Sequence, residues 1–344
     1  MAPQPKRQRV TIRTVAGDAG VSTAAVSKVL RDAYGVSANL RERVEASMRK
    51  LGYRPNTAAR GMRGQTYTLG FLIPDIHNPF FSDIMAGVNA ALERTQYQTL
   101  LGVSDSEPAM FAALVDAMVD RQMDGIMVIG PRLTTEAMGE IAQRIPTVAI
   151  AYHPAESATN FDTVNNDDQL GAALVVRHLV EAGHRQIAFL STEIPDPSEA
   201  MVTTRRARGF QEAMKSAGLA RSANVVSAPQ TSREAQNVVR HLLQSRRRPD
   251  AIFCWTDFIA LEVLSVAREL GLAVPGDLAV VGYDNTSYCD LAQNALTSVD
   301  QSGQVLGLQA ARLLIERIKG RTMPEHFVVT PRLVKRASSA PAGP

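Results

Sequence analysis

Short apolar runs alternate with amphipathic stretches along most of this chain, beginning at residue 68. The runs lie at residues 68–73, 98–103, 125–129, 148–150, 186–190, 251–254 and 278–283. Strands that are apolar throughout and alternate with helices are typical of parallel sheets covered by helices on both faces. The pattern therefore predicts an α/β body of two such units, with a boundary near residues 162–166. A long last helix, expected at residues 301–319, indicates that the chain crosses back to the first unit.

Three short helices are predicted ahead of this body. Apolar residues recur at helical spacing over residues 12–19, and Gly20 then breaks the pattern. Ser22 offers a side-chain oxygen to cap a second helix over residues 23–30, and a third helix is expected over residues 38–51. Three helices of this size and spacing are typical of a helix-turn-helix unit, whose second helix enters the major groove of DNA.

The second of these helices has one apolar and one polar side. Its inner face is expected to be Val26, Val29 and Leu30. The side chains left pointing outward, and therefore the candidates for reading base edges, are Thr23, Ala24, Ser27 and Lys28.

Charge is divided unevenly between these two parts. Residues 1–64 hold 13 Lys and Arg against 4 Asp and Glu, whereas residues 65–344 hold 24 against 30. The net charge of +3 is therefore the sum of a basic head and an acidic body, and a basic head favours a polyanionic partner. The plain alternative is a solvated charged face, which charge alone does not exclude.

Several classes of protein are disfavoured by what the sequence lacks. It has no run of 18 or more apolar residues, and its first nine residues are polar and basic, so we expect neither membrane spanning nor secretion. Cys254 and Cys289 have no CxxC or Cys–His spacing, so we expect no disulfide framework and no metal. No HExxH, GxSxG or GxxxxGKS motif is present, and we expect no cofactor and no enzyme activity.

The head and the end of the body resemble one known family. The matching segments are Thr11-Ile12, Val15-Ala16, Ala19-Gly20-Val21-Ser22, Val26-Ser27, Val36-Ser37, Arg41-Glu42-Arg43-Val44, Leu51-Gly52-Tyr53-Arg54-Pro55-Asn56 and Arg336-Ala337-Ser338. These segments closely resemble the lactose-repressor (LacI/GalR) family of bacterial transcription regulators, and the resemblance covers nearly the whole chain.

The resemblance implies an all-α helix-turn-helix head, a hinge helix and a bilobed α/β body like that of periplasmic sugar-binding proteins. Its implied boundaries are residues 10–53 for the DNA-binding domain and 54–66 for the hinge helix and linker. The N-terminal lobe would comprise residues 67–163 with 294–323, and the C-terminal lobe residues 164–293 with 324–338.

The resemblance also implies which residues contact DNA. Base readers of the family match Thr23, Ala24 and Lys28, and the hinge would place Met62 in the minor groove as an apolar wedge, where the family usually has Leu. Met is more flexible than Leu, and Gly61 beside it lowers helix propensity, so a loosely ordered hinge is expected. The expected DNA-binding residues are Thr11, Ser22, Thr23, Ala24, Ser27, Lys28, Arg54, Asn56, Arg60 and Met62.

A ligand site is expected where the strands end, because ligands of open α/β sheets bind beyond the carboxyl ends of the strands. The resemblance assigns Arg206 and Asp284 to the effector, Phe80 and Phe81 to the first lobe's ring positions and Tyr152 to stacking on the ligand. The full set of expected effector-binding residues is Asp75, Phe80, Phe81, Tyr152, Arg206, Trp255, Asp257 and Asp284.

Some of these residues have a plain alternative role. Phe80 and Phe81 are equally suited to the core, Trp255 to packing within its lobe, and Asp257 to capping a helix. Thr256 stands where the family has Asn, which puts in doubt an effector that needs an amide there. Arg205 and Arg208 are near enough to replace Arg206 if the register is shifted.

The sequence therefore indicates a cytoplasmic, nucleoid-associated transcription regulator, expected to be a repressor. It would bind a palindromic operator as a homodimer, without membrane contact, under the control of a sugar-like effector that acts as inducer or corepressor. The alternative is a cytoplasmic sugar-binding or sugar-processing protein. An enzyme of this kind would need an acid and base pair in the cleft, for which Asp257 and Asp284 are the candidates.

Overall fold

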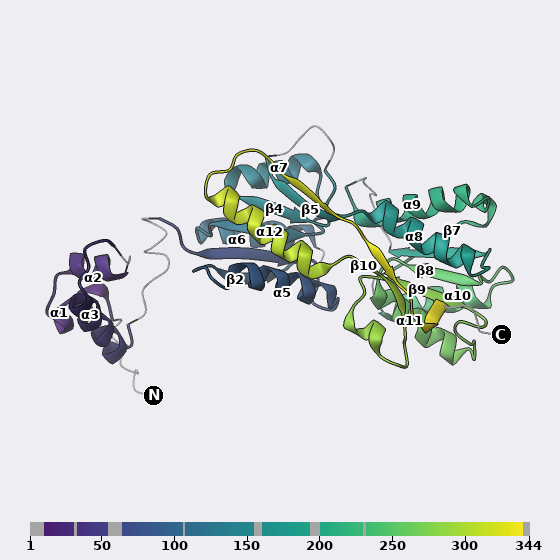
Figure 1. Cartoon of the computed structure of the whole chain (residues 1–344), viewed down its shortest axis with the longest axis horizontal. Helices are drawn as coiled ribbons and strands as arrows, with labels where there is room; N and C mark the ends of the chain where they lie inside the picture. The colour runs from purple at the N-terminus through teal and green to yellow at the C-terminus, as the bar shows by residue number, and fades with distance from the viewer. Residues whose placement is uncertain are drawn as a thin grey trace, which may run out of the picture. The chain divides into compact units, whose positions relative to one another are not determined.

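The computed structural model describes residues 10–30, 33–53, 64–105, 107–154, 160–192, 200–229 and 232–339. The chain divides into two compact units, a head comprising Met1–Thr66 and a body comprising Tyr67–Pro344. Figure 1 labels the helices and strands of both units.

The head contains the three predicted helices, α1 (Ile12–Ala19), α2 (Thr23–Leu30) and α3 (Ala38–Leu51). Each helix begins with a side-chain cap: Thr11 accepts from the backbone of Thr14, Ser22 from that of Ala25, and Ser37 from that of Leu40. These caps satisfy N–H groups that a helix start leaves without partners. The small core that the three helices share is Val15, Ala16, Ala19, Val26, Val29 and Val44.

The first sheet of the body runs in the order β11-β5-β4-β3-β1-β2, with all pairs parallel. Its strands are β1 (Thr68–Ile73), β2 (Gln98–Val103), β3 (Gly125–Ile129), β4 (Thr147–Ile150), β5 (Asp162–Asn166) and β11 (His326–Val329). One face packs on α5 (Phe80–Leu92) and α12 (Gly303–Ile318), the other on α6 (Pro108–Asp120) and α7 (Thr135–Arg144).

The second sheet runs in the order β12-β10-β9-β8-β6-β7 and is parallel except for β12. Its strands are β6 (Ile187–Thr192), β7 (Asn224–Ala228), β8 (Ala251–Cys254), β9 (Ala279–Tyr283), β10 (Thr297–Asp300) and β12 (Arg332–Val334). One face packs on α8 (Asp168–Glu181) and α9 (Val202–Ser216), the other on α10 (Ser232–Gln244) and α11 (Asp257–Glu269).

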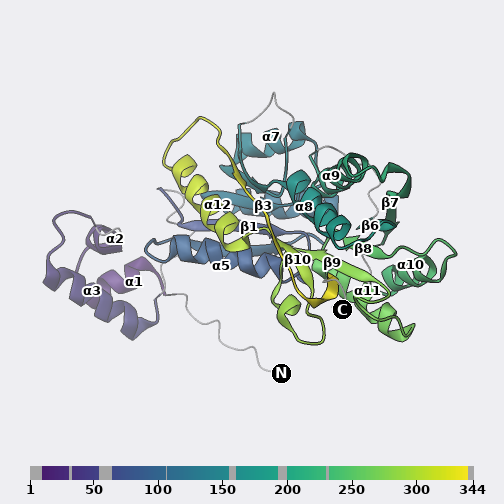
Figure 2. The same ribbon diagram turned by 45° about the vertical axis from the view of Figure 1, so that its right-hand side comes forward.

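The chain passes from one lobe to the other after β5, after β10 and between β11 and β12, and the last passage is the long yellow stretch in Figures 1 and 2. These strands move the lobe boundaries from the expected ones. The first lobe extends to residue 166 and includes residues 326–329, whereas residues 297–300 belong to the second lobe. The strands next to the crossings are short or rich in polar residues. The pattern of apolar runs therefore did not reveal where the chain changes lobe.

Two glycines let α5 and α12 approach each other closely. A Cβ on Gly87 would overlap the carbonyl oxygen of Gln304, and a Cβ on Gly307 would overlap that of Ile84. The clash would be with backbone, which cannot move aside as a side-chain end can. This contact joins the last helix to the first helix of the same lobe.

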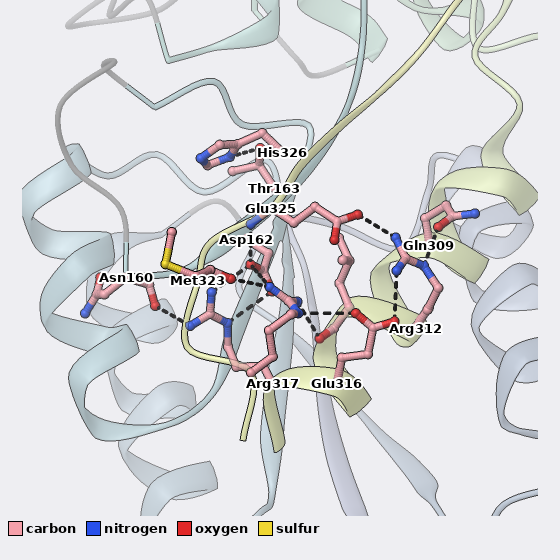
Figure 3. A network of polar contacts seen from close by, with 12 residues as sticks. Asn160, Asp162, Thr163, Gln309, Arg312, Glu316, Arg317, Met323, Glu325 and His326 are labelled. Atoms are coloured by element: carbon pink, nitrogen blue, oxygen red, sulfur yellow. Dashed lines mark hydrogen bonds and ion pairs between the residues drawn. The ribbon is translucent and has the colours of Figure 1, made fainter. Parts of the chain in front are cut away.

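A buried carboxylate ties β5, α12 and the start of β11 together, as Figure 3 shows. Asp162 accepts from Arg317 at 2.7 Å, from Arg321 at 2.7 Å and from the backbone N–H of Glu325 at 2.9 Å. Burial raises the pKa of Asp162, but the two guanidinium groups outweigh it and the net pKa is lowered. Asp162 is therefore charged and paired at the start of β5, the last strand before the chain leaves the first lobe.

Candidate functional site

A cleft lies between the two lobes of the body, at the carboxyl ends of both sheets. Its first-lobe wall includes Asp75, Asn78, Phe80, Phe81 and Arg132. The second-lobe wall includes Thr192, Thr203, Arg206, Trp255 and Asp284, and Gln301 lies where the chain crosses between the lobes. This is the position at which ligands of open α/β sheets bind.

Arg206 enters the cleft from α9 and is fixed on three sides. Its Nε donates to Asp168 at 2.7 Å, one terminal nitrogen donates to the carbonyl of Trp255 at 2.6 Å, and the other donates to Gln301 at 3.3 Å. Only 3% of the residue is exposed, so the ion pair with Asp168 is buried. The alternatives in a shifted register do not occupy this place: Arg208 is exposed and pairs with Glu212, and Arg205 does not line the cleft.

The partner of Arg206 holds its charge despite burial. Burial raises the pKa of Asp168, but Arg206 and the 2.9 Å contact with His153 Nε2 outweigh it, so the net pKa is lowered. Burial likewise lowers the pKa of Arg206, and Asp168 reverses this effect. The guanidinium and carboxylate are therefore both ionised, and Arg206 keeps two further N–H groups for another acceptor.

Asp284 directly follows β9 and lines the cleft. Its carboxylate oxygens accept two hydrogen bonds from side-chain amides. Asn78 of the first lobe donates to it at 2.9 Å, and Gln301 donates at 2.5 Å. Burial raises the pKa of Asp284 to about 8, although Arg206 acts in the opposite direction. Its φ of 113° lies in a region that non-glycine residues rarely adopt, a strain of the kind found at ligand sites.

Three aromatic residues predicted for the site line the cleft and also pack into the lobes. Phe80 is 4% exposed and belongs to the first-lobe core, while Phe81 is half-buried beside it. Trp255 packs against the core clusters on both faces of the second sheet. These residues therefore line the cleft and pack with the lobe cores at once, and their contact with a ligand stays a prediction.

Asp75 lies on the cleft wall, where its carboxylate organises the turn ahead of α5. It accepts from the backbone N–H groups of His77 and Asn78, at 2.7 and 3.1 Å. Asn78 in turn accepts from the backbone N–H of Phe80, the first residue of α5, at 3.0 Å.

Two expected effector residues lie outside the cleft lining. Tyr152 has no exposed surface, its hydroxyl donates to the carbonyl of Leu133 at 3.1 Å, and its ring packs near Phe161. Its neighbour Ala151 lines the cleft instead. The strand end alone did not reveal this, because Ala151 has a positive φ of 56° and turns the following side chain inward.

Asp257 faces the loop after β9, away from the cleft lining. Its oxygens accept from Ser298 at 2.5 Å, from the backbone and hydroxyl of Thr286 at 2.7 and 3.0 Å, and from the thiol of Cys289 at 3.1 Å. The cap of α11 is Thr256, whose hydroxyl accepts from Ile259 at 3.5 Å. Asp257 therefore holds a loop in place, and Thr256 occupies the capping role.

Several cleft residues did not emerge from the sequence. Asp168, which fixes Arg206, and Gln301, which joins Arg206 to Asp284, are placed by contacts far apart in the chain. Thr192 and Thr203 look like ordinary residues at a strand end and a helix start. Arg132 lies three residues beyond the end of β3, and this position was the one available signal for it.

In the head, the polar face of α2 is where the sequence predicts it. Thr23, Ala24 and Lys28 are exposed, and Ser27 is half-buried. Thr11 and Ser22 use their hydroxyls as helix caps. The expected hinge residues Arg54, Asn56, Arg60 and Met62 lie outside the described residues.

Within the described parts of the chain, no group of three or more His, Cys, Asp and Glu side chains is placed to hold a metal ion. Nor does any described helix combine the length and apolar character that crossing a bilayer requires. Cys254 and Cys289 are both buried and free.

Family models match both units of the chain. Residues 11–56 match the model of bacterial regulatory proteins of the lacI family, and residues 176–339 match a periplasmic binding protein-like domain.

Named relatives cover almost the whole chain. Catabolite control protein A of Priestia megaterium is 32% identical over 95% of this chain and 98% of its own length. The HTH-type transcriptional repressor CytR of Escherichia coli K12 is 30% identical over 93% of both chains. Among solved structures, the transcriptional regulator CelR in complex with cellobiose is 28% identical, with a TM-score of 0.69 over 96% of this chain and 100% of that one.

Proposed function

Because the chain belongs to the lacI family of bacterial regulatory proteins, we propose that it represses transcription by binding operator DNA as a homodimer, under the control of a small effector in the cleft. In the head, α2 presents Thr23, Ala24 and Lys28 to the major groove. Ala24 offers a methyl contact and Lys28 a single cationic donor, so base reading is thin and deformation of the DNA contributes to specificity.

One observation carries the effector part of this proposal. Asn78 of the first lobe donates to Asp284 of the second lobe inside the cleft, at 2.9 Å. A ligand that binds Asp284 or Arg206 changes the contacts made across the cleft, and therefore favours one angle between the lobes. If the effector changes the free energy of operator binding, the operator changes the free energy of effector binding by the same amount. This holds whether the effector weakens or strengthens operator binding.

An exposed apolar edge supports the homodimer. Leu100 and Leu101 on the edge strand β2 are 48% and 53% exposed, and Tyr288 and Leu291 of the second lobe are 46% and 42% exposed. Uncovered apolar edge strands pair with another chain. Two copies joined about a two-fold axis would present two heads to a palindromic operator.

The cleft chemistry favours a hydroxylated, sugar-like effector. Hydroxyl groups of a ligand can hydrogen-bond to ionised Arg206 and to the amides of Asn78 and Gln301. The apolar face of a sugar ring can stack on the flat faces of Phe81 and Trp255. CelR, a relative in fold and sequence, is known with a bound sugar. The enzyme alternative has less support, because Asp257, one of its two candidate carboxylates, does not face the cleft.

The test is operator binding of the full chain in the presence and absence of ligands. Duplexes selected from random sequence should be bound tightly and with strong salt dependence, and a ligand that raises Tm should change that affinity. Turnover of a candidate sugar, or a failure to bind any selected duplex above non-specific levels, would overturn the proposal.

A further inference from the structure

Buried polar atoms of the second lobe line the cleft without a hydrogen-bond partner among the described residues. They are the hydroxyls of Thr192 and Thr203 and the indole N–H of Trp255. Both threonines are 4% exposed, so water does not reach most of their surface. Buried polar groups are nearly always hydrogen-bonded, and an orphaned one is costly. Three at one wall indicate a ligand that supplies their partners.

The start of α9 faces the same wall. Met201, Val202 and Thr203 line the cleft, and Met201 at the helix start provides no side-chain cap. The first turn of a helix leaves N–H groups without partners in the helix, and its dipole adds partial positive charge there. A fifteen-residue helix that opens on a cleft in this way attracts an anion.

The acceptors in the cleft are largely used by the protein itself. Asp75 accepts from two backbone N–H groups, Asp168 from Arg206 and His153, and Asp284 from two amides. Much of the unused capacity consists of donors: the indole N–H and the remaining N–H groups of Arg206 can only donate, and the two threonine hydroxyls can donate as well as accept. The missing partner is therefore rich in acceptors.

The balance of charge points the same way. Arg132 on the facing lobe is exposed at the cleft and makes no ion pair with any described residue. The charge of Arg206 is offset by Asp168, and the raised pKa of Asp284 keeps this carboxyl largely protonated at neutral pH. Asp75 is the remaining carboxylate on the wall, and its hydrogen bonds come from neutral backbone N–H groups of its own turn. Arg132 thus offers the cleft a guanidinium group that forms no ion pair with a described residue.

We propose that the effector carries an anionic group, a carboxylate or a phosphate, which binds against the first turn of α9 between Thr192, Thr203 and the indole of Trp255. Arg132 closes over this group from the first lobe, and the hydroxylated remainder of the effector extends toward Arg206 and Asp284. The inference rests on the proposed function and specifies the ligand class for the same cleft.

The experiment measures Tm and Kd of the full chain with defined probes. These are inorganic phosphate against chloride at equal ionic strength, and the matched compounds glucose, glucose 6-phosphate, gluconate and glucuronate. We expect phosphate and at least one anionic compound to raise Tm, while glucose does not. A response to the phosphate ester alone or to the acids alone identifies which anionic group is bound.

Matched threonine variants locate the site. Thr203→Val removes the hydroxyl at constant shape and should weaken the anionic probe about tenfold or more, since a hydrogen bond to a charged group contributes about 1.5–3 kcal/mol. Thr204→Val is the control, because its hydroxyl is also buried without a partner but does not line the cleft. The Thr204→Val variant should change the Kd of the anionic probe less than about twofold. In a separate variant, Arg132→Gln should reduce the salt dependence of probe binding.

Any of three results would overturn the inference: no stabilisation by phosphate or any anionic compound, equal affinity for glucose and its charged counterparts, or equal losses in Thr203→Val and Thr204→Val. Its failure is distinct from that of the proposed function. A chain that binds a selected duplex and is released by a neutral sugar remains a repressor without an anion site. A chain that binds phosphate at α9 but no duplex is not a repressor.

Discussion

The guanidinium carbon of Arg206 lies 3.6 Å from the centroid of the Tyr283 ring. The Tyr283 hydroxyl also contacts Asp168 at 3.4 Å, so ring, carboxylate and guanidinium form one buried group. Arg206 is therefore held in its cleft orientation before any ligand arrives. An arginine positioned in this way loses little conformational entropy on binding, which increases the affinity that each of its remaining N–H groups provides.

Removal of Arg206 should destabilise the body as well as weaken effector binding. Arg206→Gln leaves Asp168 buried without its main partner, and breaking a buried pair costs about 3–5 kcal/mol. The double variant Asp168→Asn with Arg206→Gln should recover a large part of this loss, because no unpaired charge remains. Urea unfolding of the single and double variants measures the coupling, and strictly additive effects would contradict a buried ion pair.

The raised pKa of Asp284 gives the body a specific pH dependence. In the folded protein the carboxyl keeps its proton up to about pH 8, whereas in the unfolded chain it loses it near the ordinary value of 3.8. Between about pH 4 and pH 8 the folded state therefore binds one more proton at Asp284 than the unfolded state does. The contribution of Asp284 to the free energy of unfolding consequently decreases as the pH rises across this range. The free energy of unfolding of the wild type minus that of Asp284→Asn should thus decrease from about pH 4 to about pH 8 and then level off. A difference that rises with pH would exclude a raised pKa.

The Asp162 network should contribute far more than the exposed ion pairs beside it. Asp162→Ala leaves Arg317 and Arg321 without a buried partner, and we expect a loss of about 3 kcal/mol in the free energy of unfolding. Arg312→Ala is the control: it breaks the pairs with Glu316 and Glu325, whose side chains are 37% and 42% exposed, and should cost less than about 1 kcal/mol. Equal losses in the two variants would show that burial of Asp162 has no special effect.

The close approach of α5 and α12 makes a single methyl group costly. Gly307→Ala forces a Cβ against the backbone of Ile84, and we expect it to lower the free energy of unfolding by about 1–3 kcal/mol. Gly139→Ala in α7 should instead stabilise the body by up to about 1 kcal/mol, because its Cβ meets only an ordinary contact with Asn160. Chemical denaturation distinguishes the two signs directly.

Replacement of Met62, for which we propose the role of minor-groove wedge, should tighten operator binding. Met62→Leu exchanges a flexible side chain for a stiffer one of similar volume, so less conformational freedom is lost when the wedge enters a base step. The control is Met323→Leu at a methionine of the body that is 74% exposed. Titration of a labelled operator gives both Kd values, and an unchanged or weaker affinity of Met62→Leu would argue against the wedge.

The sequence alone predicted the elements that follow simple periodicity. The three head helices and the seven apolar strands agree with the structure within two residues, and for every one of these strands except the exposed edge strand β2 burial explains the apolar run. It did not predict β5, whose residues Asp162–Asn166 are all buried yet mostly polar. Asp162 is buried because Arg317 and Arg321 reach it from more than 150 residues away, and no local pattern encodes such a partner.

The cleft shows the same division. Arg206, expected from the resemblance, and Asp284, expected from the resemblance and from its position beyond a strand end, both line the cleft, and their contact with an effector stays a prediction. Asp168 was missed, because its role depends on a contact with Arg206 across 38 residues. Tyr152 and Asp257 follow strands as expected, but the turn at Ala151 and the loop held by Thr286 direct their side chains into the interior.

Trp255 is the single tryptophan of the chain, and its indole lines the cleft with a buried N–H. Light absorbed at the red edge of the protein spectrum therefore excites one indole, located in the cleft where we propose that the effector binds. Its emission wavelength and intensity should report occupancy of the cleft without any attached dye, and stopped-flow mixing with ligand gives the rate of that change.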